Sequence, residues 1–312
     1  MKKIRVMSQT DNPTIERVIE EFNSSCELRG LSPRTVENYE TTLDLFYTFL
    51  KANDIIYPKD VDIQVVENFV VYLKSQKLKD STINYYLRNI RVFLKWCEDR
   101  ELMKRVKVKE LKIDTPIKET YTQEELRTLL RKPAKPKSFL DFQTWAVENF
   151  LYATGARIGV LPTIHIEDLD FKNKTISITR TKNRKGMVVP MSNALKKVLL
   201  EFLKVRKGEP TDFLFCNAYG GATSVRALQG QIYDYNLDHG ITKTSAHLFR
   251  SSFAKAYILN GGDAFRLQKL LGHAHISTTQ IYVNMFSTDL QKDYDKFNPL
   301  DNLTIRGEKI KL

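Results

Sequence analysis

The chain has 312 residues and a net charge of +12 at pH 7, because 49 Lys and Arg stand against 37 Asp and Glu. This length suits about two domains of ordinary size, and a composition with 42% hydrophobic residues excludes a wholly disordered chain. The excess of positive charge indicates a polyanionic partner, either nucleic acid or an anionic membrane surface, although a solvated lysine-rich surface has the same balance.

Membrane-spanning and secreted proteins are not expected from this sequence. The longest apolar runs, such as residues 69–73, are far shorter than the roughly 18 residues that a membrane span needs. The N-terminus carries charge without an apolar stretch behind it, so no signal peptide is predicted. An odd number of widely separated cysteines is typical of free core residues in a reducing compartment. They are Cys26, Cys97 and Cys216.

Residues 12–102 form the first predicted domain, after an N-terminal extension of residues 1–11. Apolar residues from Ile15 to Phe22 recur at helical spacing, which predicts a first helix. Ser32 and Pro33 predict the start of a second helix, because proline favours the first helical position. We expect this domain to be nearly all helix.

A later helix of this domain has a basic face. Arg88, Arg91 and Lys95 recur three and four residues apart after a helix start near Asp80. Side chains at this spacing can follow a phosphate backbone. They can equally form an ordinary solvated helix face.

A basic segment, residues 103–118, separates the first domain from the second. It lacks a helical stripe and contains Pro116, so we predict an extended linker. A basic linker suits a chain that encircles an anionic rod, and its candidate contacts to that rod are Lys104, Arg105 and Lys107.

Residues 119–286 form the second predicted domain, which mixes helices with a few strands. Thr122 and Glu125 form a capping box at its first helix. A further helix is predicted over residues 140–154 and is closed by Gly155. Strands are predicted over residues 164–170, 175–180 and 187–190, and helices resume from residue 193. The predicted fold class is therefore mainly α with a small antiparallel β-sheet (α+β).

The remaining residues, 287–312, form a predicted C-terminal tail. Leu290, Tyr294 and Phe297 recur at helical spacing in it. The tail can dock on a neighbouring protomer or pack on its own domain, and the sequence does not decide between them.

Several residues near the C-terminus have side chains suited to phosphate chemistry. His247 and Arg250 are three residues apart on a helix that Thr244 or Ser245 can cap, so they lie on neighbouring positions of one face. Arg offers a rigid bidentate fork to a phosphate, and His a titratable proton. His273 follows Gly272 at a helix end, and Tyr282 follows nine residues later. A phenolate can attack phosphorus and form a covalent intermediate.

The stretch from His247 to Tyr282 resembles the C-terminal signature of the tyrosine recombinases, the phage integrase family. It reads His-x-x-Arg, then Leu-Leu-Gly-His, then Thr-Thr-x-x-Tyr. Residues 153–158 resemble the family segment with its first catalytic arginine, and residues 182–190 resemble the hairpin with its catalytic lysine. Residues 31–35, with Tyr39, resemble the core-binding domain. The resemblance therefore implies a helical core-binding domain followed by a tyrosine-recombinase catalytic domain.

The resemblance implies six catalytic residues and needs neither a metal nor another cofactor. Tyr282 would attack the scissile DNA phosphate, assisted by His247, and Lys182 would protonate the leaving 5′-oxygen. Two arginines would stabilise the transition-state charge, and a second histidine would hydrogen-bond the phosphate. These are Arg157, Arg250 and His273. A zinc site that combined His273, His275 and His247 is not favoured, because no Cys or carboxylate stands at ligand spacing.

The implied function is site-specific recombination through a 3′-phosphotyrosyl intermediate and a Holliday junction. The partners would be double-stranded DNA recombination sites, bound by a homo-tetramer, and a free monomer in solution is compatible with this. The location would be cytoplasmic and nucleoid-associated, with no membrane contact. Arg184 and Lys185, in the hairpin loop, are further candidate DNA contacts.

The sequence departs from the family pattern at Val160, where an acidic residue usually follows the first arginine. Glu167 and Asp168 are candidate replacements for that acceptor. The departure favours integration or excision of a mobile element over an Xer-type recombinase that resolves chromosome dimers. Two further classes are compatible with the pattern, a type IB topoisomerase with the same chemistry and a non-catalytic DNA-binding regulator with the same fold.

Overall fold

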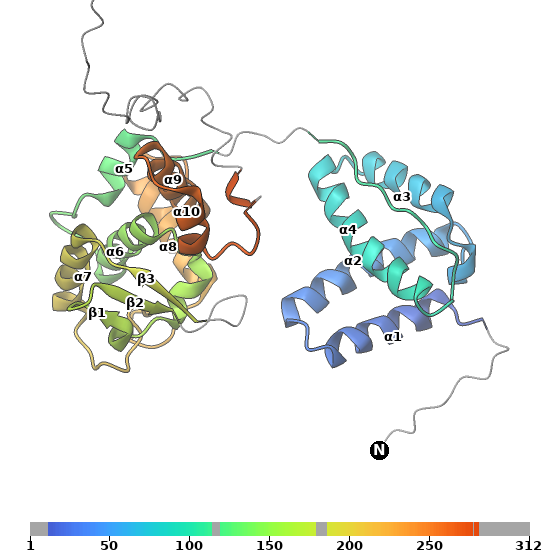
Figure 1. Ribbon diagram of the computed structural model, residues 1–312, viewed down its shortest axis with the longest axis horizontal. Coiled ribbons are helices and arrows are strands. Elements are labelled where there is room, and N and C mark those ends of the chain that lie inside the picture. The colour runs from blue at the N-terminus through green and yellow to red at the C-terminus, as the bar shows by residue number, and fades with distance from the viewer. Residues whose placement is uncertain (1–11, 114–118, 179–185, 277, 281–312) are drawn as a thin grey trace, which may run out of the picture. The chain divides into compact units, whose positions relative to one another are not determined.

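A computed structural model describes residues 12–113, 119–178, 186–276 and 278–280. The chain divides into two compact units, Met1–Pro116 and Ile117–Leu312. Helices dominate both units, and the second also contains a three-stranded antiparallel sheet, so the predicted fold class is confirmed (Figure 1). None of the described helices is long and apolar enough to cross a membrane.

The described part of the first unit has four α-helices around an apolar core. They are α1 (Ile15–Leu28), α2 (Pro33–Ala52), α3 (Ile63–Ser75) and α4 (Asp80–Glu98). Ser32 caps α2, since its hydroxyl accepts from the Thr35 amide at 3.2 Å, as its place before Pro33 predicts. Phe22 lies at the centre, where its ring meets Phe93 and Trp96 edge to face. Such pairs are favourable beyond the apolar area that they bury.

The extended segment after α4 packs on the first unit. Met103 and Val108 are buried in the core of this unit. The Asn84 side chain on α4 donates to the Leu111 carbonyl at 2.9 Å and accepts from the Leu111 amide at 2.7 Å. The segment is therefore extended, as predicted, but as far as Leu111 it belongs to the first unit. The domain boundaries expected from the sequence remain predictions.

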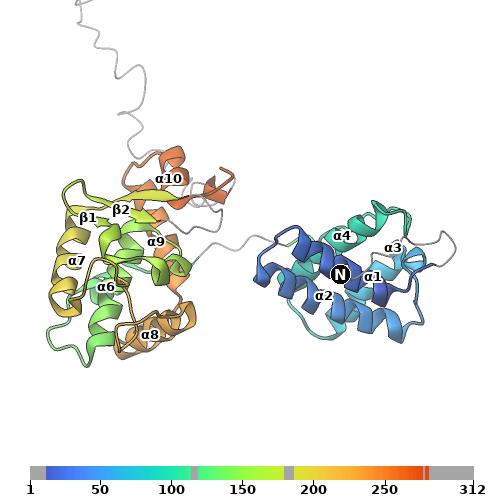
Figure 2. The same ribbon diagram turned by 90° about the horizontal axis from the view of Figure 1, so that it is seen from below.

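The second unit surrounds a central helix. It contains α5 (Gln123–Leu130), α6 (Phe139–Thr154), α7 (Asn193–Arg206), α8 (Val225–Asp238), α9 (Ala246–Leu259) and α10 (Ala264–Leu271). Helix α6 packs against α7, α8 and α9 and lies between α7 and α9 in Figure 2. Ten of its sixteen residues are buried, so the helix is enclosed on most sides, as expected of a central helix.

The small sheet has the order β1-β2-β3, with β1 at Leu169–Asp170, β2 at Thr175–Ile178 and β3 at Met187–Pro190. All neighbours are antiparallel, and Ile176 pairs with Val189. Ile176 and Val189 are buried and Val188 is exposed, as the alternating pattern predicts.

The predicted strand over residues 164–170 is interrupted: only Leu169–Asp170 form a strand, and His165 forms an isolated antiparallel bridge with Phe213. Ile166–Asp168 form a 3-10 turn instead. The Asp168 carboxylate accepts from the His165 amide at 2.8 Å, and the Ile166 amide donates to the Asp212 carbonyl at 2.9 Å. The bond to Asp212 belongs to the bridge at His165, whereas the bond of Asp168 ends the extended backbone there. An aspartate that bonds the backbone locally competes with extended pairing.

Candidate active site

The structure describes four of the six predicted catalytic residues. Arg157 follows the end of α6, His247 and Arg250 lie on α9, and His273 follows α10. Helices α9 and α10 pack together and are drawn in orange and red in Figure 1. The predicted nucleophile Tyr282 and Lys182, with Arg184 and Lys185, lie outside the described residues.

Gly155 ends α6 and lets three helices meet at the site. Its φ of 62° is left-handed, a conformation that favours glycine. A Cβ at this position would overlap the side chains of Phe253 on α9 and Leu271 on α10. The Gly155 carbonyl accepts from Nη1 of Arg250 at 2.6 Å. The glycine therefore permits the close approach that brings the end of α6 to Arg250.

Arg250 is buried and held in a fixed orientation. Only 4% of its surface is exposed. Besides its bond to Gly155, Nη2 donates to the Leu271 carbonyl at 2.8 Å and contacts Nε2 of His273 at 2.8 Å. Neutral acceptors from three segments thus hold the guanidinium, and its planar fork allows them to do so at once. An arginine held in this way is already oriented when an anion arrives.

The contact with Arg250 assigns the tautomer of His273. A guanidinium can only donate, so Nε2 of His273 is the acceptor and Nδ1 carries the proton. Nδ1 therefore donates a hydrogen bond to the hydroxyl oxygen of the buried Thr279, at 2.9 Å. Gly272, which is left-handed at a φ of 61°, ends α10 and turns the chain toward this position.

Arg157 and Arg250 line the same small cavity. Its volume is about 40 Å³, and Met187 of β3 is also in its lining. Arg157 is exposed to solvent, whereas Arg250 is buried and held by its hydrogen bonds. Two guanidiniums at one cavity can together bind one anionic group.

Val160, at the position where the family pattern has an acidic residue, also lines this cavity. Neither of the candidate replacements, Glu167 and Asp168, is among the described lining residues. The Asp168 carboxylate is engaged with His165, whose Nδ1 is 3.7 Å away.

His247 lies on the exposed side of α9, one turn before Arg250. Ser245 caps this helix, since its hydroxyl accepts from the His247 amide at 3.3 Å. Of the two residues that the sequence allows as the cap, the structure therefore selects Ser245 over Thr244.

The predicted basic face of α4 is paired with an acidic residue that no sequence motif singles out. Glu110 accepts from Nη1 of Arg88 at 2.9 Å and from Nη1 of Arg91 at 3.1 Å. Nε of Arg91 also donates to the Val108 carbonyl at 3.2 Å. The two arginines are 22 and 19 residues from Glu110 in sequence, so no local pattern reveals the pairing.

The other predicted DNA contacts within the described residues are exposed. Lys95 pairs with Glu98 and Asp99 at 3.3 and 2.8 Å on its own helix. The basic residues of the extended segment face solvent, while Met103 and Val108 face the core. They line a groove of the first unit with a volume of about 750 Å³. These residues are Lys104, Arg105 and Lys107.

In the part of the chain that the structure describes, no group of three or more His, Cys, Asp or Glu side chains is arranged to hold a metal ion. The three cysteines are buried and unpaired with one another.

Comparison with known families gives two matches that together span most of the chain. Residues 119–288 match the phage integrase family, and residues 14–113 match the phage integrase SAM-like domain.

Two curated relatives match nearly their whole length. Tyrosine recombinase XerD of Oceanobacillus iheyensis is 27% identical over 297 residues, which cover 91% of this chain and 99% of the relative. Tyrosine recombinase XerC of Lacticaseibacillus casei is 28% identical over 296 residues, which cover 88% and 95%.

Two solved structures have the same fold. The Tn1549 transposon integrase in complex with transposon right end DNA has a TM-score of 0.69 at 18% identity, and the match covers 86% of this chain and 94% of that one. The XerH site-specific recombinase bound to palindromic difH substrate has a TM-score of 0.69 at 19% identity, with 89% and 83% covered.

Proposed function

Because the chain belongs to the phage integrase family of tyrosine recombinases, we propose that it recombines DNA at specific sites by cleaving and rejoining strands. The observation that carries this proposal is the pair of arginines at one cavity, with Arg250 buried and fixed by Gly155, Leu271 and His273. Such a pair suits the charge that develops on a phosphate during strand transfer.

In the proposed reaction the Tyr282 oxygen forms a bond to the scissile phosphorus, and the bond from phosphorus to the 5′-oxygen breaks. His247 takes the tyrosine proton, and Lys182 gives a proton to the leaving 5′-oxygen. Arg157 and Arg250 bind the non-bridging oxygens. The 3′-phosphotyrosyl bond conserves the energy of the phosphodiester, so a second 5′-hydroxyl can attack it without ATP.

His273 must change its hydrogen bonds before it can donate to the phosphate. Its Nε2 accepts from Arg250 and its Nδ1 bonds Thr279. To donate a hydrogen bond to the phosphate, Nε2 must gain a proton and release the guanidinium. We propose that the incoming phosphate takes the place of His273 on Arg250, and that the freed Nε2 takes up a proton from solvent and donates to the phosphate.

A suicide substrate nicked beside the cleavage position tests the proposal. We expect the wild-type protein to form a covalent complex with such DNA and the Tyr282→Phe variant to form none. If the wild type forms no covalent complex with any DNA, the protein is a regulator that only binds DNA. Relaxation of every supercoiled plasmid without recombinant products would identify a topoisomerase.

Two biological roles fit this activity. Integration or excision of a mobile element is the first, favoured by the departure at Val160. Xer-type recombination is the second, favoured by relatives named XerD and XerC that match 95 to 99% of their own length. Sequencing the DNA recovered from covalent complexes separates the two, because one role gives element ends and the other a chromosomal site.

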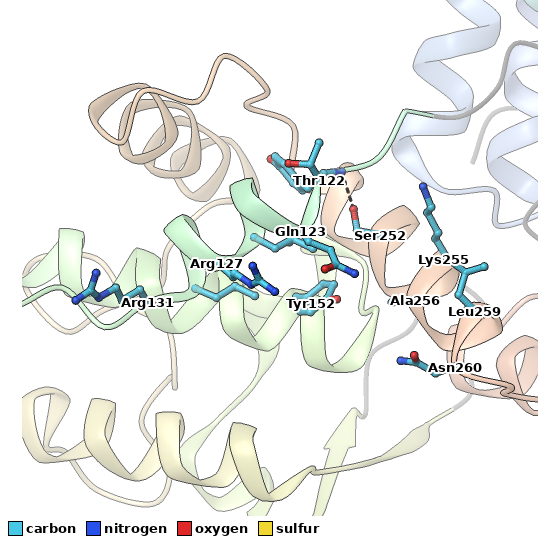
Figure 3. A pocket seen from close by; sticks show the side chains of 13 residues that line it. Thr122, Gln123, Arg127, Arg131, Tyr152, Ser252, Lys255, Ala256, Leu259 and Asn260 are labelled. Carbon is cyan, nitrogen blue, oxygen red and sulfur yellow. Dashed lines mark hydrogen bonds between the residues drawn. The ribbon is translucent and has the colours of Figure 1, made fainter.

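The proposed assembly is a homo-tetramer on two DNA duplexes in the cytoplasm, associated with the nucleoid. A pocket of about 700 Å³ between α5, α6 and α9 is the proposed docking site for the tail of residues 287–312 (Figure 3). Its lining combines apolar Leu126 and Leu259 with basic Arg127 and Lys255. The tail offers complementary groups, which are Leu290, Tyr294 and Phe297 with Asp289, Asp293 and Asp295.

A further inference from the structure

Tyr121, two residues before α5, contacts α9 at three levels. Its backbone amide donates to the Ser252 hydroxyl at 2.8 Å, the dashed line in Figure 3. Its ring packs on Phe249, with 4.6 Å between the ring centroids. Its hydroxyl lies 3.2 Å from the Lys243 carbonyl and 3.4 Å from the Ser245 carbonyl, at the start of α9. Tyr121 therefore contacts α9 from the residues before its first turn to its middle.

Asn236 on α8 fixes the direction of the Tyr121 hydroxyl. Its Nδ2 donates to that hydroxyl at 3.0 Å and to the Lys243 carbonyl at 2.7 Å. Since the amide nitrogen can only donate, the phenol must give its own proton to the carbonyls before α9. Both side chains are buried, with 0% of Asn236 and 4% of Tyr121 exposed. Burial also raises the pKa of Tyr121 above its usual range, so the hydroxyl stays a donor.

The same turn is held from the other side by Lys243. Its Nζ donates to the Thr120 carbonyl at 3.2 Å and to Glu125 Oε2 at 3.0 Å. The segment of residues 119–125 is thus bonded to the segment of residues 243–252 at several points. Several hydrogen bonds that are at least partly shielded from water thus tie the two segments together, which makes this part of the structure rigid.

His247 and Arg250 lie on α9 between the levels that Tyr121 contacts. We propose that Tyr121 is a positioning residue for these two groups, which fixes the start of α9 so that both meet the DNA phosphate. This inference rests on the proposed recombinase function. A displacement of about 1 Å in a catalytic group costs about a hundredfold in rate, so a residue that fixes the helix contributes to the rate without touching DNA.

The test removes one oxygen atom. Tyr121→Phe keeps the ring on Phe249 and the backbone bond to Ser252, and it loses only the bonds of the hydroxyl. Tyr235→Phe is the matched control, because Tyr235 is also a buried tyrosine, at 3% exposure, and its hydroxyl has no hydrogen-bond partner among the described residues.

Two measurements are needed. In amide hydrogen exchange of the free protein, we expect faster exchange over residues 245–252 in Tyr121→Phe and no change there in Tyr235→Phe. In single-turnover cleavage of the suicide substrate, we expect the rate constant of Tyr121→Phe to fall about tenfold or more. We expect the fraction of active enzyme and the Kd for DNA to stay unchanged. This distinguishes the effect from partial unfolding, which would lower the active fraction and leave the rate constant unchanged.

Failure of the Tyr121 inference can be distinguished from failure of the proposed recombinase function. Unchanged exchange in Tyr121→Phe would overturn the inference even if cleavage proceeds as proposed. Faster exchange with an unchanged rate constant would show that Tyr121 only stabilises the fold, and would also overturn it. If the wild type itself cleaves no DNA, the proposed function fails, and the inference that rests on it fails with it, whatever the exchange data show.

Discussion

Arg250 illustrates how a single side chain is prepared for catalysis by its surroundings. Two backbone carbonyls and one imidazole nitrogen hold its guanidinium at 2.6 to 2.8 Å. The His-x-x-Arg pattern identified Arg250 from the sequence. The two carbonyls belong to Gly155 and Leu271, at the ends of α6 and α10, which are 95 and 21 residues from Arg250 along the chain. Such long-range partners are set by packing and cannot be read from local sequence.

Replacement of Arg250 by lysine should separate binding from chemistry. Lysine keeps the charge but offers a point charge in place of a planar fork, so it cannot bond Gly155, Leu271 and a phosphate together. We expect Arg250→Lys to cleave the suicide substrate at least about a hundredfold more slowly. Its affinity for DNA should change little, which a filter-binding titration beside the single-turnover assay will measure. A near-normal rate would show that the fork is not used.

Glu148, on α6, is the most unusual titratable residue in the described part of the second unit. It is fully buried, and neither carboxyl oxygen has a hydrogen-bond partner in the part of the chain that is described. Burial raises the pKa of Glu148 well above its usual range. The folded protein therefore favours the protonated carboxyl more strongly than the unfolded chain does.

The raised pKa of Glu148 predicts a loss of stability as pH rises. The unfolded chain releases this proton near the ordinary pKa of 4.5, whereas the folded protein keeps it to a higher pH. The contribution of Glu148 to stability is therefore fully present below pH 4.5 and is lost as pH rises toward the folded pKa. We expect the free energy of unfolding of the wild type, relative to Glu148→Gln, to fall by about 1.4 kcal/mol per pH unit across this window. Urea denaturation at several pH values measures this, with the exposed Glu124→Gln as control. Equal pH profiles for wild type and Glu148→Gln would contradict it.

At the scale of elements, most helices could be predicted because their signals are local. The caps at Ser32, Thr122 and Ser245 are all observed, and Gly155 ends α6, as predicted, in a left-handed conformation. The strand over residues 164–170 is interrupted by a 3-10 turn over Ile166–Asp168, because Asp168 bonds the His165 backbone. The packing of the basic segment on α4 was also not foreseen, since it depends on contacts of Asn84 and Glu110 across 19 to 27 residues.

Glu110 should weaken DNA binding by α4. It occupies the guanidiniums of Arg88 and Arg91, which are exposed and would otherwise be open to phosphates. We expect Glu110→Gln to bind non-specific DNA several-fold more tightly at low salt, with a steeper dependence on salt. Glu20→Gln on α1 makes the same change of charge away from these arginines and is the control. An equal gain in both variants would show a general charge effect and contradict a specific role for Glu110.

For the whole molecule, the net charge of +12 now divides into parts with different roles. Some of it is exposed on the extended segment after α4, some is paired with Glu110, and a small part lies at the cavity of Arg157 and Arg250. Charge alone indicated only a polyanion. The spacing of the catalytic motifs indicated the chemistry, and the structure adds how Arg250 is held.

Removal of the tail should affect assembly more than the binding of a single site. We expect a chain that ends at residue 286 to bind one recombination site with near-normal affinity and to form few complexes of two duplexes. Leu259→Asp, in the proposed docking pocket, should have the same effect, since a carboxylate would meet the acidic residues of the tail. Analytical ultracentrifugation with DNA measures both. Normal two-duplex complexes in both variants would contradict docking of the tail in this pocket.

The most direct test of the proposed chemistry is to identify the residue that becomes attached to DNA. Covalent complexes formed on the suicide substrate are digested with protease and nuclease, and the nucleotide-bearing peptide is sequenced by mass spectrometry. We predict a 3′-phosphoryl nucleotide on Tyr282, its absence in the Tyr282→Phe variant and its much slower formation in Arg250→Lys. Attachment at another residue, attachment through a 5′-phosphate, or no attached peptide at all would contradict the proposed mechanism.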